Sequence, residues 1–235
     1  RAIEHANRLI EEGADILDIG AESSRPGAQP TSESEELARL LPVLESLAGC
    51  GVPISVDTYK PQVMAAALAQ GASMINDITG FRTQEAVDIV AASECSVCIM
   101  HMQGEPLTMQ QEPSYGDVCA EVSVFLAERA EALGRAGVIK DRIMLDPGFG
   151  FGKNLEHNLA LFKGLGRMAS SGFPLLVGVS RKSMLGAITG RPVGERLVAS
   201  VAAAVMAAER GVAVVRVHDV AATKDALAVW QALRN

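Results

Sequence analysis

The sequence predicts an α/β fold of the TIM (β/α)8 barrel type in which the first strand is absent, leaving seven strands and eight helices. Short apolar runs typical of buried parallel strands alternate with helical patterns along the chain. Nearly every run ends beside a polar side chain, which favours a barrel rim over the single switch point of an open sheet. Because the chain opens on a helix, we expect the eighth strand to precede Arg1.

The predicted strands share nearly continuous apolar character and cover residues 14–20, 52–57, 72–78, 96–101, 142–146, 174–179 and 213–218. Each is bounded by turn residues or by a helical pattern. If this alternation is a barrel, the polar residues at the carboxyl ends of the strands gather on one rim.

The predicted helices have recognisable starts and stops. Apolar residues at Ala2, Ala6 and Leu9 mark the first helix, which stops at Gly13. A capping-box pattern at 32–35 begins the second helix, and a proline at 61 suits the first turn of the third. Further helices are expected over 83–93, from about 116 to 135, in the intervals between the last three strands, and from about 223 onward.

Composition limits the class of protein. We expect one domain over residues 1–235, because no linker or shift in composition divides the chain. A net charge of −7 without a basic tract excludes a nucleic-acid footprint. The longest apolar stretch, 197–208, is shorter than the roughly 20 residues of a membrane span and predicts a buried helix. Cysteines without zinc-site spacing indicate reduced thiols and a cytoplasmic protein.

Three strand-end residues supply the first candidate site. Asp57, Asn76 and Asp146 offer two carboxylates and an amide on one rim, which suits a flat, nitrogen-rich heterocycle such as a 2-amino-4-oxo pyrimidine. Taken singly, each is also explained as a helix cap or a turn residue. Their joint placement favours binding.

The segment 146–153 is the most specific stretch of the chain. It holds three glycines, one proline and two of the six phenylalanines, Phe149 and Phe151. An aromatic ring fixed in such a loop could stack on a planar substrate. The alternative is a plain turn whose phenylalanines pack in the core.

Cations follow the last two predicted strands. Arg181 and Lys182 follow the sixth, while Arg216 and His218 share one face of the seventh and could clamp a diphosphate together. TIM barrels often bind phosphate at the loops after strands seven and eight, where these residues fall once the absent strand is counted. A solvated charge cluster is the alternative. The loop 23–27 could receive a second substrate that carries a carboxylate.

Motifs along the whole chain resemble the bacterial dihydropteroate synthases: DIG at 18–20, ESSRPG at 22–27, SVDT at 55–58, IND at 75–77, MHMQG at 100–104, DPGFGFGK at 146–153, SRKS at 180–183 and RVHD at 216–219. The resemblance implies an SN1-like transfer of the pterin-methyl group of 6-hydroxymethyl-7,8-dihydropterin diphosphate to 4-aminobenzoate. The products are 7,8-dihydropteroate and diphosphate, in folate biosynthesis.

The resemblance also implies residue roles. Asp57, Asp146 and Lys182 are the expected catalytic residues. Pterin and its diphosphate are expected to contact Ser24, Asp57, Asn76, Ile78, Met100, Asp146, Phe151, Gly178, Lys182, Arg216 and His218. The aminobenzoate is expected to contact Ser24, Arg25, Pro26 and Ser183.

Further implications concern the cofactor and the partners. Mg²⁺ is the expected cofactor, but its asparagine ligand is expected in a loop before Arg1, so no metal ligand is assigned in this chain. The resemblance also implies a homodimer, for which helices near 196–210 offer an apolar face, and sulfonamides as inhibitors. Many relatives have threonine where this chain has Ser24, which keeps the hydroxyl and lacks the methyl group, so we expect its contacts to the aminobenzoate or to sulfonamides to differ from theirs.

Two other functions are compatible with a pterin-binding barrel. A methyltetrahydrofolate methyltransferase would not need the cations at 180–183 or the pair Arg216 and His218. A pterin-binding protein without catalysis would keep the slot but would not turn over.

Overall fold

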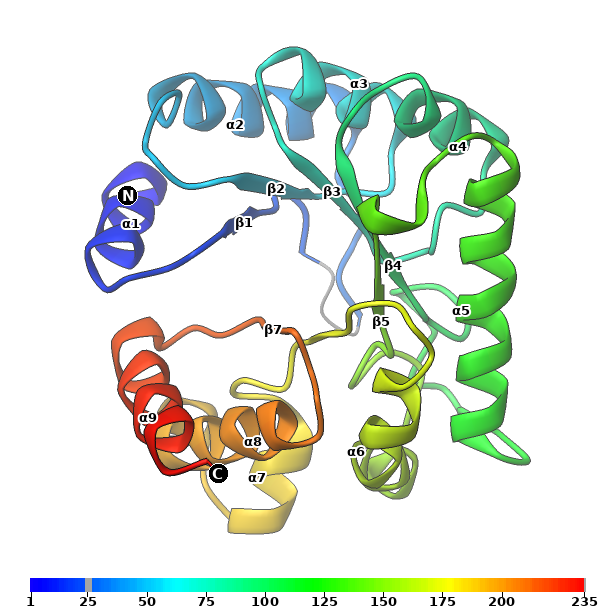
Figure 1. Cartoon of the computed structure of the whole chain (residues 1–235). Coiled ribbons are helices and arrows are strands. Elements are labelled where there is room, and N and C mark those ends of the chain that lie inside the picture. Colours follow the sequence, from blue (N-terminus) through cyan, green and yellow to red (C-terminus); the bar gives the residue numbers. More distant parts are fainter. Residues whose placement is uncertain (24–26, 235) are drawn as a thin grey trace.

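A computed structural model of the chain describes residues 1–23 and 27–234 (Figure 1). Its strands are β1 (Leu17–Ile19), β2 (Ile54–Asp57), β3 (Met74–Asp77), β4 (Ser96–Met100), β5 (Ile143–Asp146), β6 (Leu176–Val177) and β7 (Val214–Val215). Its α-helices are α1 (Ala2–Glu11), α2 (Glu33–Ser46), α3 (Pro61–Ala69), α4 (Gln84–Ala91), α5 (Val118–Arg135), α6 (Leu155–Ala169), α7 (Ser183–Thr189), α8 (Leu197–Glu209) and α9 (Val220–Leu233).

The strands are parallel and follow the chain order around an arc. Strands β1 to β5 form one sheet, β6 and β7 form a second, and a single bridge between Leu145 and Leu175 joins the two. Helices surround this arc on the outside, and α1 and α9 flank the interval between β1 and β7 (Figure 1). Within the described residues β1 and β7 do not pair with each other. The predicted parallel arrangement is therefore confirmed, with two strand edges unpaired.

One predicted helix is wrong in its extent. The interval between β6 and β7 holds two helices, α7 and α8, so the described residues contain nine α-helices rather than eight. The break occurs at Gly190, which caps α7 in the left-handed conformation with φ of 70°. Pro192 follows and precedes a short 3₁₀ turn at Val193–Glu195. Glycine followed by proline is a strong stop signal for a helix.

The predicted helix starts are partly confirmed. Pro61 occupies the first turn of α3. Ser32 caps α2, and its Oγ accepts the backbone N–H of Glu35 at 3.3 Å. The Glu35 carboxylate pairs instead with Arg39 one turn later. An exposed ion pair of this spacing therefore takes the acceptor that a full capping box would use.

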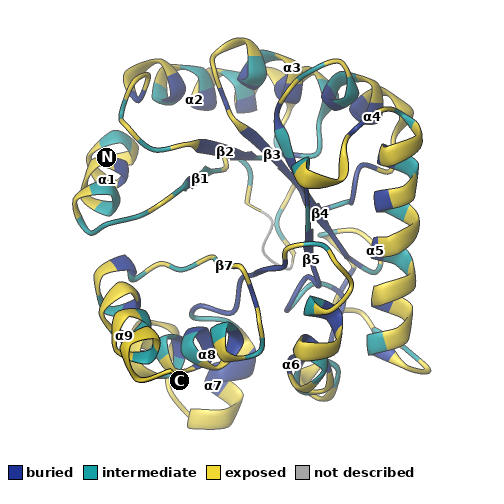
Figure 2. Ribbon diagram, in the orientation of Figure 1, coloured by how far each residue is buried: buried dark blue, intermediate teal, exposed yellow. Residues whose placement is uncertain are grey.

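The hydrophobic core lies between the strands and the inner faces of the helices, which are buried in Figure 2. Leu40 and Leu44 of α2 are almost fully buried there. The predicted buried helix at 197–208 is buried on one side only, because Val198 of α8 is 79% exposed while Ala204 is 1% exposed. All four cysteines are free thiols. Among the described residues no helix is long and apolar enough to cross a membrane.

We expect Leu44→Ala to lower the free energy of unfolding by about 2–5 kcal/mol, because it empties a packed site between α2 and the sheet. Val124→Ala, at a 56% exposed position of α5, is the matched control and should change it by less than about 0.5 kcal/mol. Urea unfolding followed by circular dichroism measures both. Equal losses in the two variants would contradict this assignment of the core.

Candidate active site

The carboxyl ends of the strands bring polar side chains from distant parts of the chain onto one rim. In the parallel register Asp18 lies beside Ser55, and Asp57 lies beside Asn76. Asp146 ends β5 two strands further along the sheet. The predicted placement of Asp57, Asn76 and Asp146 on one rim is therefore correct.

Asp18 is a rim residue that the sequence-based assignment of site residues left out. Its Oδ1 accepts the Ser55 hydroxyl at 2.7 Å. Its Oδ2 accepts the Asn76 amide at 3.2 Å and the Arg216 Nε–H at 2.5 Å. Asp18 ends a predicted strand, so the strand-end pattern contains it. No local signal links it to a partner 198 residues away.

Arg216 lies between two carboxylates. Besides Asp18, it donates from Nη2 to Asp57 Oδ2 at 3.1 Å. Burial lowers the pKa of Arg216, but Asp18 and Asp57 outweigh this effect and raise it, so the guanidinium stays charged. Burial, and then the neighbouring Asp18 carboxylate, raise the pKa of Asp57 to about 7 in spite of Arg216. Asp57 is thus poised to exchange a proton near neutral pH.

Asn76 has an unsatisfied acceptor. Its side chain is 4% exposed, its Nδ2 is bonded to Asp18, and its Oδ1 has no hydrogen-bond partner. Among the described residues no other buried side-chain nitrogen or oxygen lacks a partner. Leaving such a group unpaired costs about 1–3 kcal/mol. A bound ligand with an N–H group would recover this cost.

Asp146 and Lys182 form a second charged pair of the rim. Asp146 Oδ1 accepts the Gly148 N–H at 2.7 Å, and burial raises the pKa of Asp146 although Lys182 opposes this. Lys182 donates to the Phe149 carbonyl and lies 4.6 Å from the ring centroid of Phe151. Burial lowers the pKa of Lys182 to about 8, while Asp146 and Asp57 favour its charged form. Lys182 can therefore donate to a ligand or exchange a proton with it.

The expected pterin contacts Ile78, Met100 and Phe151 belong to one apolar cluster, together with Tyr59 and two further methionines. Phe149 behaves differently, since it is fully buried in the core and makes a T-shaped contact with Phe162 at 5.9 Å. The core explanation therefore holds for Phe149, while stacking of Phe151 on a substrate stays a prediction.

The remaining predicted residues lie toward the end of β7. Arg216, His218, Gly178 and Lys182 line one cavity of about 640 Å³. The Ser180 hydroxyl lies 3.0 Å from His218 Nδ1 and also accepts its backbone N–H at 3.2 Å. Ser183 begins α7 and is exposed. Residues 24–26, which include the predicted Ser24, Arg25 and Pro26, lie outside the described residues.

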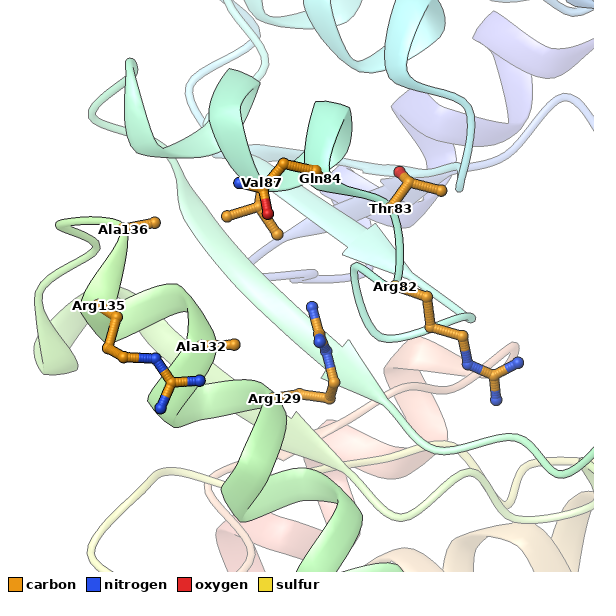
Figure 3. A pocket seen from close by; sticks show the side chains of 8 residues that line it. All are labelled: Arg82, Thr83, Gln84, Val87, Arg129, Ala132, Arg135 and Ala136. Carbon is orange, nitrogen blue, oxygen red and sulfur yellow. The ribbon is translucent and has the colours of Figure 1, made fainter.

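A second, smaller crevice of about 300 Å³ lies between α4 and α5 (Figure 3). Arg129 reaches from α5 toward α4, whereas Arg82 points away from it. Arg129 Nε donates to the Gly80 carbonyl at 2.8 Å, and its Nη2 donates to the Phe81 carbonyl. This guanidinium holds the turn after β3, so we do not assign the crevice a chemical role.

The described residues contain no group of three histidine, cysteine, aspartate or glutamate side chains that could hold a metal ion. Asp18 and Asp57 lie together at the rim, but their oxygens accept hydrogen bonds from Arg216 and, for Asp18, also from Asn76. These residues do not fit a metal site built by protein ligands alone.

The chain is similar to known proteins over nearly its whole length. The model of the family described as pterin binding enzymes matches residues 1–218. The dihydropteroate synthase of Neisseria meningitidis serogroup B is 52% identical over 238 residues, which cover 99% of this chain and 84% of that protein.

Two solved structures support the same relation. The Burkholderia cenocepacia dihydropteroate synthase complexed with 7,8-dihydropteroate has a TM-score of 0.93 and 57% identity, covering 99% of this chain and 86% of that one. The Yersinia pestis enzyme with a sulfonamide drug complex has a TM-score of 0.96 and 44% identity, covering 99% and 85%. The predicted barrel class is confirmed by these neighbours.

The raised pKa of Asp57 makes the stability of the folded chain depend on pH. Between the ordinary carboxyl pKa of 3.8 and the folded value of about 7, the folded state binds more protons than the unfolded state. The free energy of unfolding should therefore fall as pH rises through this window, by up to about 1.4 kcal/mol per pH unit from this group. Urea unfolding at several pH values measures the slope.

Asp57→Asn should remove this contribution to the slope. Asp225→Asn, on the exposed side of α9, is the matched control and should keep the wild-type slope. A slope unchanged by Asp57→Asn would show that Asp57 is ionised throughout the window.

Proposed function

The chain belongs to the pterin-binding enzyme family, among the dihydropteroate synthases, and we propose how its polar strand ends bind the two substrates of that reaction. The reaction joins 6-hydroxymethyl-7,8-dihydropterin diphosphate to 4-aminobenzoate and releases diphosphate. The unpartnered Oδ1 of Asn76 carries the proposal, because a buried acceptor of this kind requires an N–H donor from a ligand. A pterin ring supplies such donors along its edge.

We propose that the pterin lies among the polar strand ends. Asp146 accepts from the amino-pyrimidine edge, Asn76 accepts from a neighbouring N–H, and Lys182 donates to a ring acceptor. Ile78, Met100 and Phe151 cover the faces of the ring, since they already form one apolar cluster. Gly178 lies beside Arg216, since a Cβ there would be in ordinary contact with the Arg216 Cβ at 3.7 Å.

The diphosphate lies toward Arg216 and His218. The bond between the pterin methylene carbon and the diphosphate oxygen breaks first, and its electron pair leaves with the diphosphate. The delocalised pterin cation that remains is favoured by the Asp57 and Asp146 carboxylates, while Arg216 favours the departing anion. The amine nitrogen of 4-aminobenzoate then bonds to the methylene carbon and loses a proton.

We place the aminobenzoate beside Ser24, Arg25, Pro26 and Ser183. Ser183 adjoins Lys182 and is exposed at the start of α7, so a second substrate can reach it next to the pterin slot. The other three residues supply a cation and a hydroxyl for a carboxylate. Sulfonamides would compete for the same position, as expected for mimics of the aminobenzoate.

We propose Mg²⁺ as the cofactor, carried in with the diphosphate. Mg²⁺ usually keeps several waters and is held by substrate phosphates together with one or two protein ligands. When bound, the ion would neutralise charge on the diphosphate.

We also propose a cytoplasmic homodimer. Its interface is the α8 face, which we define as the exposed apolar residues Ile188, Val193, Leu197, Val198 and Met206 of α7, α8 and the turn between them. Exposed apolar residues gathered on adjacent elements mark protein interfaces. The cytoplasmic location is supported by four free thiols in the described chain.

Lys182→Ala and Asp146→Ala should each weaken pterin diphosphate binding by at least about 100-fold, because each removes a charged group that would hydrogen-bond the pterin ring. Ser24→Ala should mainly raise the KM for 4-aminobenzoate. Isothermal titration and steady-state kinetics measure these effects. Equal effects of all three variants on both substrates would contradict the assignment of Asp146 and Lys182 to the pterin and of Ser24 to the aminobenzoate. Binding of the pterin diphosphate without turnover in the wild-type chain would indicate a pterin-binding protein that is not an enzyme.

Val198→Glu should convert the dimer to a monomer, because a carboxylate at the centre of the α8 face would be desolvated without a partner. Val124→Glu, at an exposed position of α5, should leave the dimer intact. Sedimentation velocity at micromolar concentration distinguishes the species. A monomeric wild type would contradict the proposed interface.

A further inference from the structure

Lys153 is a buried lysine without a hydrogen-bonded carboxylate. It ends the glycine-rich loop that follows β5 and is 2% exposed. Its Nζ lies 2.9 Å from His101 Nδ1, 2.9 Å from the Phe151 carbonyl oxygen and 3.0 Å from the Gly148 carbonyl oxygen. Its Nζ also lies 3.4 Å from the His101 carbonyl oxygen, so four acceptors surround it. Burial lowers the pKa of Lys153 to about 7, and as an ammonium it has three N–H groups to donate. The side chain therefore links the loop after β5 to His101.

The imidazole partner is suited to accept. Burial, with the nearby charge of Lys153 and then of Arg82, lowers the pKa of His101 to about 3, so its ring is neutral. The edge contact with the Phe125 ring, at a centroid distance of 5.0 Å, fixes the plane of His101. A neutral, fixed imidazole presents one lone pair to Lys153.

The loop that Lys153 holds lies tightly against the segment after β4. A Cβ at Gly148 would lie 1.9 Å from the His101 carbonyl oxygen, and one at Gly152 would lie 2.4 Å from the Gln103 carbonyl oxygen. Tyr115 adds a hydrogen bond from its hydroxyl to the Gly152 carbonyl at 2.8 Å. Lys153 thus joins two loops at a place where no side chain could separate them.

The same loop carries three groups of the pterin slot. The Gly148 N–H fixes Asp146, the Phe149 carbonyl accepts from Lys182, and the Phe151 ring lies beside Lys182. Lys153 donates to the carbonyl groups of Gly148 and Phe151, so it holds the peptide before Phe149 and the peptide after Phe151. Its position decides where these three groups point.

We propose that Lys153 is a positioning residue for the pterin slot, acting through the loop 146–152 and not through contact with substrate. This inference rests on the proposed function for its substrate. A lysine that only stabilised the fold would change both substrates' kinetics alike or change neither. A residue that positions this loop changes the KM for the pterin diphosphate and leaves the KM for the aminobenzoate unchanged, because the predicted contacts of the aminobenzoate come from other loops.

The test uses Lys153→Met in the full chain, with Lys163→Met at an exposed position of α6 as the matched control. Methionine fills the volume but removes the Nζ donor from the Gly148 and Phe151 carbonyls, and the Gly148 carbonyl keeps only the Phe151 N–H at 3.1 Å. We expect the KM for pterin diphosphate to rise by about tenfold or more, in line with the cost of small misplacements of binding groups. The KM for 4-aminobenzoate should stay within about twofold, and the control should match wild type in both.

Amide hydrogen exchange of residues 148–152 in the ligand-free protein is the second readout. It should quicken in Lys153→Met and remain at the wild-type rate in Lys163→Met. Tyr115→Phe, which removes only the bond to Gly152, should shift the kinetics and the exchange in the same direction by a smaller factor. This variant decides the matter if Lys153→Met does not fold.

Unchanged exchange, or equal changes in both KM values, would overturn the role of Lys153. A wild-type chain that makes no dihydropteroate would instead overturn the proposed function. The exchange measurement needs no substrate, so it would still show whether Lys153 fixes the loop.

Discussion

The contact of Arg216 with Asp18 and Asp57 is the interaction on which the rim depends. Strands β1 and β7 are unpaired with each other in the described residues, so backbone hydrogen bonds do not join the two ends of the arc. The guanidinium after β7 bonds the carboxylates of Asp18 in β1 and of Asp57 at the end of β2. The exposed ion pair of Lys224 with Asp15 adds a second link between α9 and the segment before β1. Side-chain charge at the rim therefore links the end of β7 to β1 and β2.

Removing these charged groups from solvent is unfavourable, and a bound substrate can offset part of this cost. The carboxyl groups of Asp57 and Asp146 have raised pKa values and Lys182 has a lowered one, because loss of solvent disfavours the charged form of each. Groups of this kind gather at functional sites. A substrate that donates N–H groups to the carboxyl groups and places an anion beside the cations would compensate these charges. In the proposed reaction dihydropteroate carries the N–H donors and diphosphate carries the negative charge. The first would pair with the carboxyl groups of the rim and the second with its cations.

Much of the fold could be predicted because its signals are local. Alternating apolar and helical patterns located the strands, and the left-handed Gly190 with Pro192 marks a helix break that the sequence already contains. Strand-end position alone was enough to group Asp57 with Asn76. The pairing of Asp18 with Arg216 was not predictable, because it depends on how distant strands curve toward each other. Lys153 gave no signal either, since a lysine after a glycine-rich loop normally indicates a solvated charge.

We propose that the strand ends form the pterin slot and that the loop after β5 closes it. A crystal structure of this chain soaked with 7,8-dihydropteroate should show the pterin ring within hydrogen-bond distance of Asn76 Oδ1, Asp146 and Lys182, with its aminobenzoate part directed toward Ser183. Density for the product elsewhere, such as the crevice between α4 and α5, with Asn76 Oδ1 still unpartnered, would contradict it.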